Sequence, residues 1–293
     1  MSEPSEKGNR PAEKNEMKER RKVGEMSFLE HLEELRWHII RSFIAVFVFA
    51  IIAFIFKNFI FEEIIFKPMK ADFFTNRMFA ILADLWGSEN LKINQTQLQL
   101  INISLPGQFN MSMWTAFVAG IIFGAPVIFN EFWKFVKPAL YEKEKKVASS
   151  AVIYTTFLFT IGILFGYYLI VPLSIQFFNT YSISSAVTNQ INITSYIGIV
   201  STIVLASGVI FLLPVFTYAL SKVGLITPAF MKTYRRHAYV LLFLLSAIIT
   251  PPDVFSQILV AIPLVALYEV SIFISVMVVR NDEKKEKQQE MAG

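Results

Sequence analysis

The sequence predicts an all-α membrane protein of six transmembrane helices, several of them kinked by proline, forming a concave body with both termini in the cytoplasm. Composition is the first observation: 54% of the 293 residues are hydrophobic and only 17% are charged, which is too apolar for a soluble domain. The second is six apolar runs, each except the fifth near the roughly 20 residues that cross a bilayer. They are 38–56, 112–130, 152–178, 196–220, 238–250 and 254–279.

The third observation is the distribution of Lys and Arg between the runs. Eight precede the first run, five lie in 131–151 and four in 221–237, whereas 179–195 and 251–253 contain none. Cytoplasmic loops carry the excess of Lys and Arg, so both termini are expected in the cytoplasm. The external loop 57–111 carries five, but it is long enough for this rule to weaken.

The membrane domain is expected over residues 27–279, between two cytoplasmic tails. Residues 1–26 carry seven Lys or Arg and six Asp or Glu with almost no large apolar groups, so this tail is expected to be disordered. Residues 280–293 form the second tail. No cleavable signal peptide is visible, so the first apolar run would itself be the targeting signal.

The start of the first helix carries the pattern of an amphipathic segment. Ser27 and Glu30 have the spacing of a capping box, and Arg36 and Arg41 stand where the apolar run begins, as on a cytoplasmic flank. Apolar and polar residues then separate at helical spacing into an apolar stripe (Phe28, Leu32, Leu35, Ile39) and residues away from it (Glu30, His31, Glu34, His38). We therefore expect a helix that lies at the interface and bends into the bilayer, or a charged collar that only orients the first span.

Loop 57–111 mixes aromatic residues with charges and is expected to pack short helices against the outer face.

A proline removes a backbone hydrogen bond and kinks its helix, which suggests a concave body. The prolines within runs are Pro126, Pro172, Pro214 and Pro263.

The fifth run is short. Ala238–Thr250 has 13 residues, about 20 Å of helix against a hydrocarbon core of roughly 30 Å. Pro251-Pro252-Asp253 then forces a tight turn, and Glu269 follows within the sixth run. If Glu269 faces the cytoplasmic side, the last two helices form a short hairpin that should thin the membrane locally.

The sequence offers few groups for chemistry. It has no cysteine and no recognisable catalytic motif, and His31 and His38 are too far apart to chelate one ion, so neither a metal site nor an enzyme is expected. Carboxylates gather at the cytoplasmic membrane edge instead, as Glu33, Glu34, Glu142 and Glu144. Such carboxylates suit a bidentate guanidinium partner. Spacing alone favours ordinary pairing with nearby cations along the helix.

Several motifs occur together in one order along the chain. They are HLEELR (His31–Arg36), FWKFVKPALYEKE (Phe132–Glu144) and TPPDVFSQ (Thr250–Gln257), followed by Ile262-Pro263-Leu264 and Tyr268-Glu269. Together they resemble the TatC family, the multi-span receptor subunit of the twin-arginine protein translocase, over about residues 27–277.

The resemblance implies a non-enzymatic protein of the bacterial plasma membrane that binds twin-arginine signal peptides at the cytoplasmic face. It implies assembly with single-span TatA-type and, where present, TatB-type partners, so that folded proteins cross under the proton-motive force. Self-association and lipid contact are implied too, without cofactor or nucleic acid. By motif position the signal-binding residues are Glu34, Arg36, Phe135, Pro138, Leu140 and Glu144. The residues associated with partner contact and assembly are Pro68, Leu212, Asp253 and Gln257.

The chain departs from the family pattern at two places. The fourth run commonly contains Phe-Glu-x-Pro in the family, and here Leu212 stands at the glutamate position. A carboxylate at this position would be the expected polar contact for a partner helix. Leu212 cannot make that contact. The external loop is also longer than usual, with an apparent insertion near 78–98.

Three other function classes remain for comparison. A secondary transporter would have ionisable residues near the bilayer midplane and often an internal repeat, and the sequence shows neither. An intramembrane enzyme would need catalytic groups. A plain membrane scaffold fits the composition, but it would not require Glu34 and Glu144.

Overall fold

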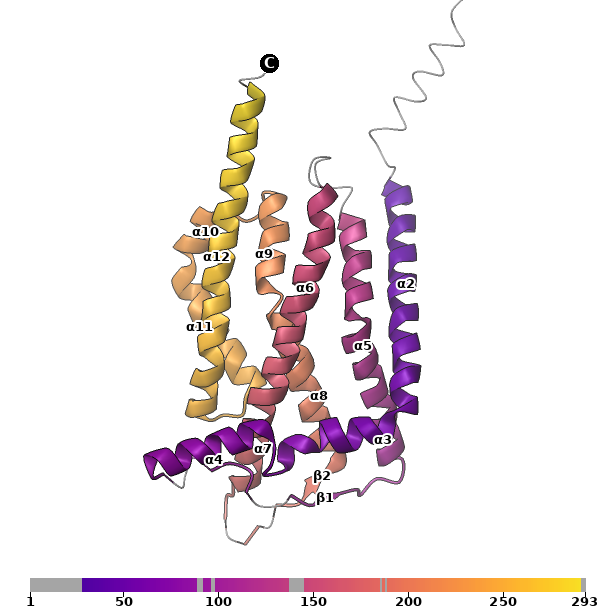
Figure 1. Ribbon diagram of the computed structural model, residues 1–293, viewed down its shortest axis with the longest axis vertical. Helices are drawn as coiled ribbons and strands as arrows, with labels where there is room; N and C mark the ends of the chain where they lie inside the picture. Colours follow the sequence, from indigo (N-terminus) through magenta and orange to yellow (C-terminus); the bar gives the residue numbers. More distant parts are fainter. Residues whose placement is uncertain are drawn as a thin grey trace, which may run out of the picture.

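Long helices standing side by side dominate the chain (Figure 1). The computed structural model describes residues 28–88, 92–95, 98–136, 145–184, 186–187 and 189–290. The longest helices are α2 (Phe28–Ile55), α5 (Gly107–Val136), α6 (Lys145–Phe165), α8 (Ile193–Ile210) and α12 (Val254–Glu290). Most of the tail expected at 280–293 therefore continues α12, and the tail expected at 1–26 lies outside the described residues.

Five segments of the described chain are long and apolar enough to cross a membrane. They are Leu32–Ile55, Gly107–Val136, Ala151–Thr180, Ile193–Lys222 and Val254–Asn281. Five of the six predicted runs are thereby confirmed as membrane-length helices. The other run forms α11 (Arg235–Ile249), whose 15 residues measure about 22 Å, so the total of six spans and the orientation of the termini stay predictions.

Two of the four prolines coincide with breaks in a span. Pro172 stands in the first turn of α7 (Val171–Thr180), directly after a π-helical turn at Gly166–Ile170 that ends α6. Pro214 stands in the first turn of α9 (Leu213–Lys222), where the chain turns after α8. A proline has no N–H to donate to the preceding turn, which is why it is tolerated where a helix begins. Helices α5 and α12 continue through Pro126 and Pro263.

The loop 57–111 contains the short helices that the sequence predicts. A helical segment from α3 (Lys57–Phe59) through α4 (Phe74–Trp86) runs across the lower ends of the long helices (Figure 1). The loop also contributes β1 (Leu100–Ile101), which pairs in parallel with β2 (Ile191–Asn192). This small sheet departs from the all-α prediction, because two-residue strands are too short to show an alternating pattern.

Two buried asparagines fasten this loop to the bundle. Nδ2 of Asn76 donates to the carbonyl oxygen of Pro68 over 3.0 Å. Nδ2 of Asn94 donates to Oδ1 of Asn76 over 3.2 Å and to the carbonyl oxygen of Pro172 over 3.0 Å, while its backbone N–H donates to Oε1 of Gln176. Asn94 has a φ of 51°, a left-handed conformation that asparagine tolerates better than most residues. The network therefore connects the loop to the start of α7.

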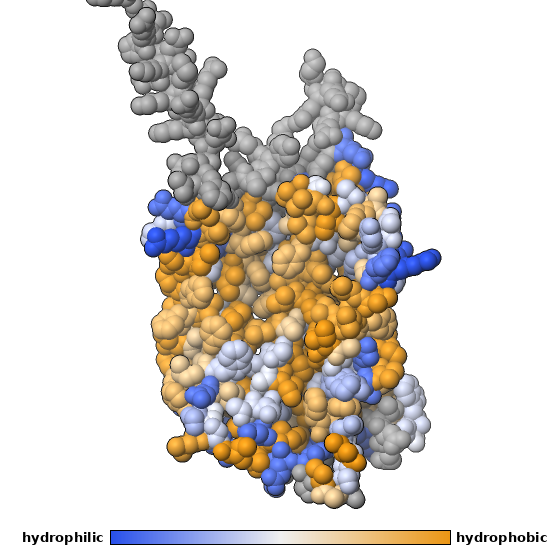
Figure 2. Space-filling view, turned by 180° about the vertical axis from the view of Figure 1, so that it is seen from behind, coloured by the Kyte–Doolittle hydropathy of each residue, from blue (hydrophilic) through white to orange (hydrophobic). Residues whose placement is uncertain are grey.

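Close helix contacts and an apolar outer surface complete the fold. Helices α2 and α5 pack tightly at Gly120, where an added Cβ would stand 2.6 Å from the Val46 carbonyl oxygen. Large apolar side chains cover the outside, among them Phe43 and Phe47 of α2, which are 66% and 67% exposed. Figure 2 shows apolar surface over the middle of the molecule, with hydrophilic residues gathered toward its two ends. This distribution is that of a multi-span membrane protein.

Candidate functional site

The predicted signal-binding residues that the structure describes lie at one end of the bundle. Glu34, half-buried, and Arg36, exposed, stand near the start of α2, and Phe135 stands near the end of α5. These two helix ends lie side by side (Figure 1). Outside the described residues lie the other three, Pro138, Leu140 and Glu144.

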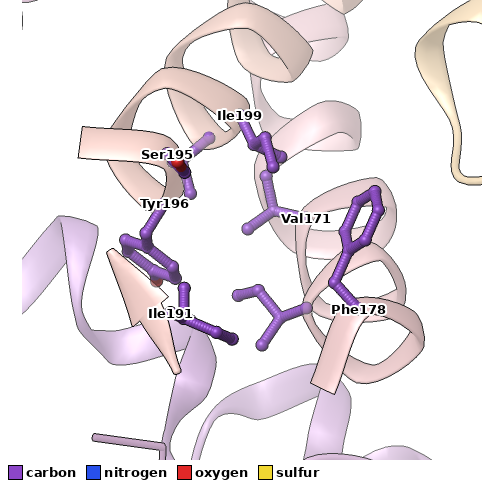
Figure 3. A pocket seen from close by; sticks show the side chains of 8 residues that line it. Val171, Phe178, Ile191, Ser195, Tyr196 and Ile199 are labelled. Atoms are coloured by element: carbon purple, nitrogen blue, oxygen red, sulfur yellow. The ribbon is translucent and has the colours of Figure 1, made fainter. Parts of the chain in front are cut away.

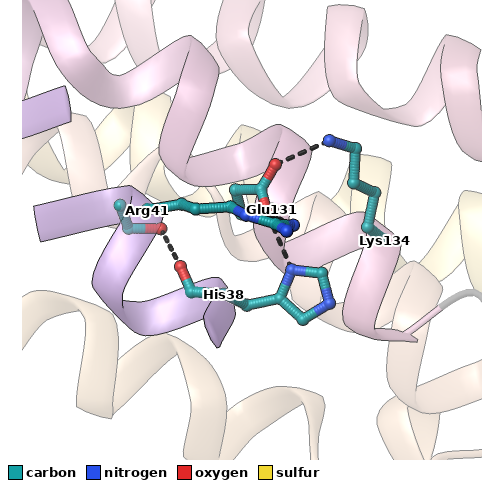
Figure 4. Close-up of polar contacts among 5 residues, drawn as sticks. His38, Arg41, Glu131 and Lys134 are labelled. Atoms are coloured by element: carbon teal, nitrogen blue, oxygen red, sulfur yellow. Dashed lines mark hydrogen bonds and ion pairs between the residues drawn. The ribbon is translucent and has the colours of Figure 1, made fainter. Parts of the chain in front are cut away.

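A buried pair of side chains joins α2 to α5 near these ends (Figure 4). His38 Nδ1 donates a hydrogen bond to Glu131 Oε2 over 2.7 Å, and the two residues are only 8% and 4% exposed. Because an ionised carboxylate can only accept hydrogen bonds, the hydrogen of the imidazole belongs on Nδ1. The His38 ring also packs edge-on against Phe135, with ring centroids 6.2 Å apart.

Two exposed cations complete this cluster. Lys134 Nζ donates to Glu131 Oε1 over 2.6 Å, and Arg41 Nη1 donates to Glu131 Oε2 over 3.5 Å. Both carboxylate oxygens are therefore engaged, one by α5 itself and one by α2. Because an unpaired buried charge costs several kcal/mol, the carboxylate favours the arrangement that keeps these two helices together.

His38 corrects the interpretation of the first helix. Helical spacing placed it away from the apolar stripe, yet it faces α5, while Leu32 and Ile39 of that stripe are 45% and 46% exposed. Helix α2 is also one uninterrupted helix, without a bend at the interface. The physical reason is the solvent: apolar side chains are stable against lipid, and polar side chains find partners inside the protein.

The motifs do not single out Glu131. The only sequence signal is its position directly after the apolar run 112–130, because an ionisable side chain at a membrane edge requires a partner. Spacing cannot identify that partner, since His38 stands 93 residues away in the chain.

The residues associated with partner contact hold local structure at the opposite end. Asp253 caps α12, because its Oδ2 accepts the backbone N–H of Ser256 over 2.8 Å. Gln257 Nε2 donates to the carbonyl oxygen of Phe243 over 3.3 Å and so ties α12 to α11. Pro68, a residue of the loop 57–111, is fully buried. Each of these residues thus has a structural role within the single chain.

Leu212 is buried as well. Its side chain is 6% exposed and packs in a small apolar cluster with Ala125 and Phe159. The neighbouring α6 and α8 approach closely, since a Cβ at Gly162 would stand 2.6 Å from the Ser207 carbonyl oxygen. A partner helix could therefore touch this position only at the edge of that cluster.

Glu269 pairs with the start of α11. Arg235 Nη2 donates to Glu269 Oε2 over 2.8 Å, and the Tyr239 hydroxyl donates to the other carboxylate oxygen. The pair joins the last two helices near the end at which α11 begins. That end carries the Lys and Arg of 221–237, so Glu269 lies toward the side that the sequence predicts to be cytoplasmic.

A small pocket of about 40 Å³ lies between α7, α8 and β2 (Figure 3). Val171, Phe178, Ile191 and Ile199 line it with the side chains of Ser195 and Tyr196. It has no charged lining residue to bind a guanidinium. Among the described residues, no group of three or more His, Asp or Glu side chains could hold a metal ion.

Comparison with known proteins gives one consistent family. A family model described as Sec-independent protein translocase protein (TatC) matches residues 30–263. The chain is 42% identical to a TatC from Blattabacterium sp. subsp. Periplaneta americana, covering 86% of this chain and 95% of that protein. It is 34% identical to TatCy of Bacillus subtilis, covering 90% and 94%. A crystal structure of a twin-arginine translocase receptor TatC in DDM matches with a TM-score of 0.65 at 33% identity, covering 84% and 99%.

Proposed function

The chain belongs to the TatC family of Sec-independent protein translocase proteins, and on that premise we propose that it is the receptor for twin-arginine signal peptides. The peptide binds at the cytoplasmic ends of α2 and α5. Glu34 and Glu144 hold its two arginines, and the surrounding surface is formed by Arg36, Phe135, Pro138 and Leu140. The similarity to a solved structure described as a twin-arginine translocase receptor supports this assignment.

The proposal rests on the orientation of His38, which faces α5. His38 contacts Glu131 of α5, and Glu34 precedes His38 by four residues. Residues four apart lie on the same face of a helix, so Glu34 is on the face of α2 that is turned toward α5. The chain that leaves α5 after Val136 is the segment with Pro138, Leu140 and Glu144. This geometry supports a site at which the two carboxylates approach each other.

Two carboxylates at this place suit arginine better than lysine. A guanidinium presents donors in a planar fork that a carboxylate accepts in bidentate fashion, whereas an ammonium is a compact point charge. The His38–Glu131 pair keeps the two helices in register, and Phe135 rests against its imidazole ring. The peptide's apolar residues would then pack on Phe135 and Leu140.

The test is the affinity of the purified protein for a signal peptide with Arg-Arg, compared with the same peptide carrying Lys-Lys. We expect a clear preference for Arg-Arg and a loss of roughly 1–3 kcal/mol of binding in Glu34→Ala and in Glu144→Ala. Glu63→Ala, which removes an exposed carboxylate at the other end of the bundle, is the control and should bind normally. Unchanged binding in the Glu34→Ala/Glu144→Ala double variant would refute the site.

We further infer that the receptor is a six-span protein of the bacterial plasma membrane that recruits TatA-type and, where present, TatB-type single-span partners. Its assembly surface includes the α11–α12 turn with Asp253 and Gln257, and the regions of Pro68 and Leu212. The buried positions of Pro68 and Leu212 favour an indirect contribution, in which they shape the surface that a partner meets. Export of folded proteins then uses the proton-motive force.

A further inference from the structure

A groove opens between three of the long helices. It has a volume of about 550 Å³ and is lined by α5, α6 and α8, with the segment between α3 and α4 across one end. In Figure 1 α5 and α6 stand next to each other, with α8 fainter behind them. Its wall is mostly apolar, as shown by Val118, Ile122, Ile163, Leu164 and Val204.

Polar groups are placed at two levels of this groove. Thr115 lies on α5, about 12 Å from the start of that helix. It is 6% exposed, and its hydroxyl oxygen has no hydrogen-bond partner. A buried hydroxyl without a partner is costly, so this group needs an acceptor that the described residues do not supply.

The mouth of the groove carries both signs of charge. Glu63, Lys67 and Asp72 line it, and Lys67 Nζ lies 3.0 Å from Glu63 Oε2. The hydrogen bond and charge of Lys67, with a smaller contribution from nearby Lys70, keep the pKa of Glu63 below its usual value. The lining therefore presents two carboxylates beside one ammonium, which complements a headgroup that itself carries a cation and an anion.

We propose that this groove binds one membrane phospholipid with an amine-bearing, zwitterionic headgroup. The acyl chain lies along α5, α6 and α8, the phosphate accepts from Lys67, and the ammonium is placed at Glu63 and Asp72. An ester carbonyl of the lipid accepts the hydrogen bond of Thr115 once rotation of that side chain turns its enclosed hydroxyl toward the groove. This binding site does not depend on the signal-peptide site, which lies at the other end of α2 and α5.

The apolar wall of the groove suits an acyl chain, which requires no polar partners along its length. Hydrocarbon is also the medium that surrounds these spans, so an apolar groove open to it is filled by lipid rather than water.

The test is native mass spectrometry of the full-length protein in mixed micelles that contain equal amounts of phosphatidylethanolamine and phosphatidylglycerol. We expect one retained lipid per protein, with phosphatidylethanolamine preferred at least about fivefold. Thr160→Phe places a bulky ring in the groove and should weaken retention by at least about fivefold. Its matched control is Thr202→Phe on α8, an exposed position that does not line the groove and should leave retention unchanged.

The headgroup is tested separately at the exposed mouth. The double variant Glu63→Gln/Asp72→Asn leaves Lys67 and Lys70 as the local charges, so the preference should reverse toward phosphatidylglycerol. Circular dichroism checks that each variant is folded. If Thr160→Phe does not fold, the proposal is judged on the double variant Glu63→Gln/Asp72→Asn. Equal retention of both lipids by the unmodified protein would overturn the proposal, as would normal retention in folded Thr160→Phe. A photo-crosslinker at position 160 that captures a protein helix in native membranes would also overturn it.

Discussion

Replacing Glu131 by alanine is expected to destabilise the protein by about 2–4 kcal/mol. The largest contribution is the hydrogen bond from His38, because its loss leaves a buried ring N–H without an acceptor; such a loss costs about 1.5–3 kcal/mol when one partner is charged. Lys134 and Arg41 are half exposed, with side-chain exposures of 50% and 58%. Each of these two pairs therefore contributes less than about 1 kcal/mol.

Glu131→Gln separates the hydrogen bond from the charge. Its amide oxygen can still accept from His38, so only the attraction to the exposed cations is lost, and the expected cost is about 1 kcal/mol or less. A double-mutant cycle of Glu131→Ala with His38→Ala should give a coupling free energy of about 1–3 kcal/mol.

The measurement is the free energy of unfolding in mixed micelles, titrated with a denaturing detergent and followed by circular dichroism. Glu63→Ala removes an exposed carboxylate that also pairs with a lysine, and it should leave stability unchanged. If Glu131→Gln costs as much as Glu131→Ala, attraction to the cations dominates and the argument from the buried hydrogen bond is wrong. A Glu131→Ala variant as stable as Glu63→Ala would refute the structural role altogether.

Three further predictions concern other parts of the chain. Asn76→Ala should cost about 2–4 kcal/mol in the same assay, because Asn76 donates to the Pro68 and Lys70 carbonyls and accepts from Asn94; Asn58→Ala, an exposed site, is the control, and equal stability of the two variants would contradict the anchoring role. Leu212→Glu should destabilise strongly, because it buries a charge without a partner, whereas Leu212→Met should be tolerated; full stability of the glutamate variant would show that the position is accessible. The chain has no cysteine, so exposed Val187→Cys and Val223→Cys can be labelled in whole cells with an impermeant thiol reagent. We expect labelling at 187 only, and labelling at 223 would reverse the predicted orientation.

The sequence predicted the spans well where the physical signal is strong and local. A run of about 20 apolar residues is unstable in water and needs no partner to cross a bilayer, so five of the six runs could be placed from composition alone. Irregular helix geometry at Pro172 and Pro214 was also predictable, because proline lacks the N–H that the preceding turn requires, whereas Pro126 and Pro263 interrupt neither α5 nor α12. The two-residue strands were not, because their pairing joins Leu100 to Ile191 across a distance that no local pattern encodes.

The sequence by itself determined the class of this protein and, through its ordered motifs, its family. It also predicted carboxylates at the cytoplasmic membrane edge (Glu33, Glu34, Glu142 and Glu144), and their role stays a prediction. Only the tertiary structure decided that His38 points into the protein and meets Glu131. It alone decided that Asp253 caps a helix and that Leu212 is buried. The physical reason is that hydrophobicity and proline act within one segment, whereas the partner of a polar group depends on which helices pack together.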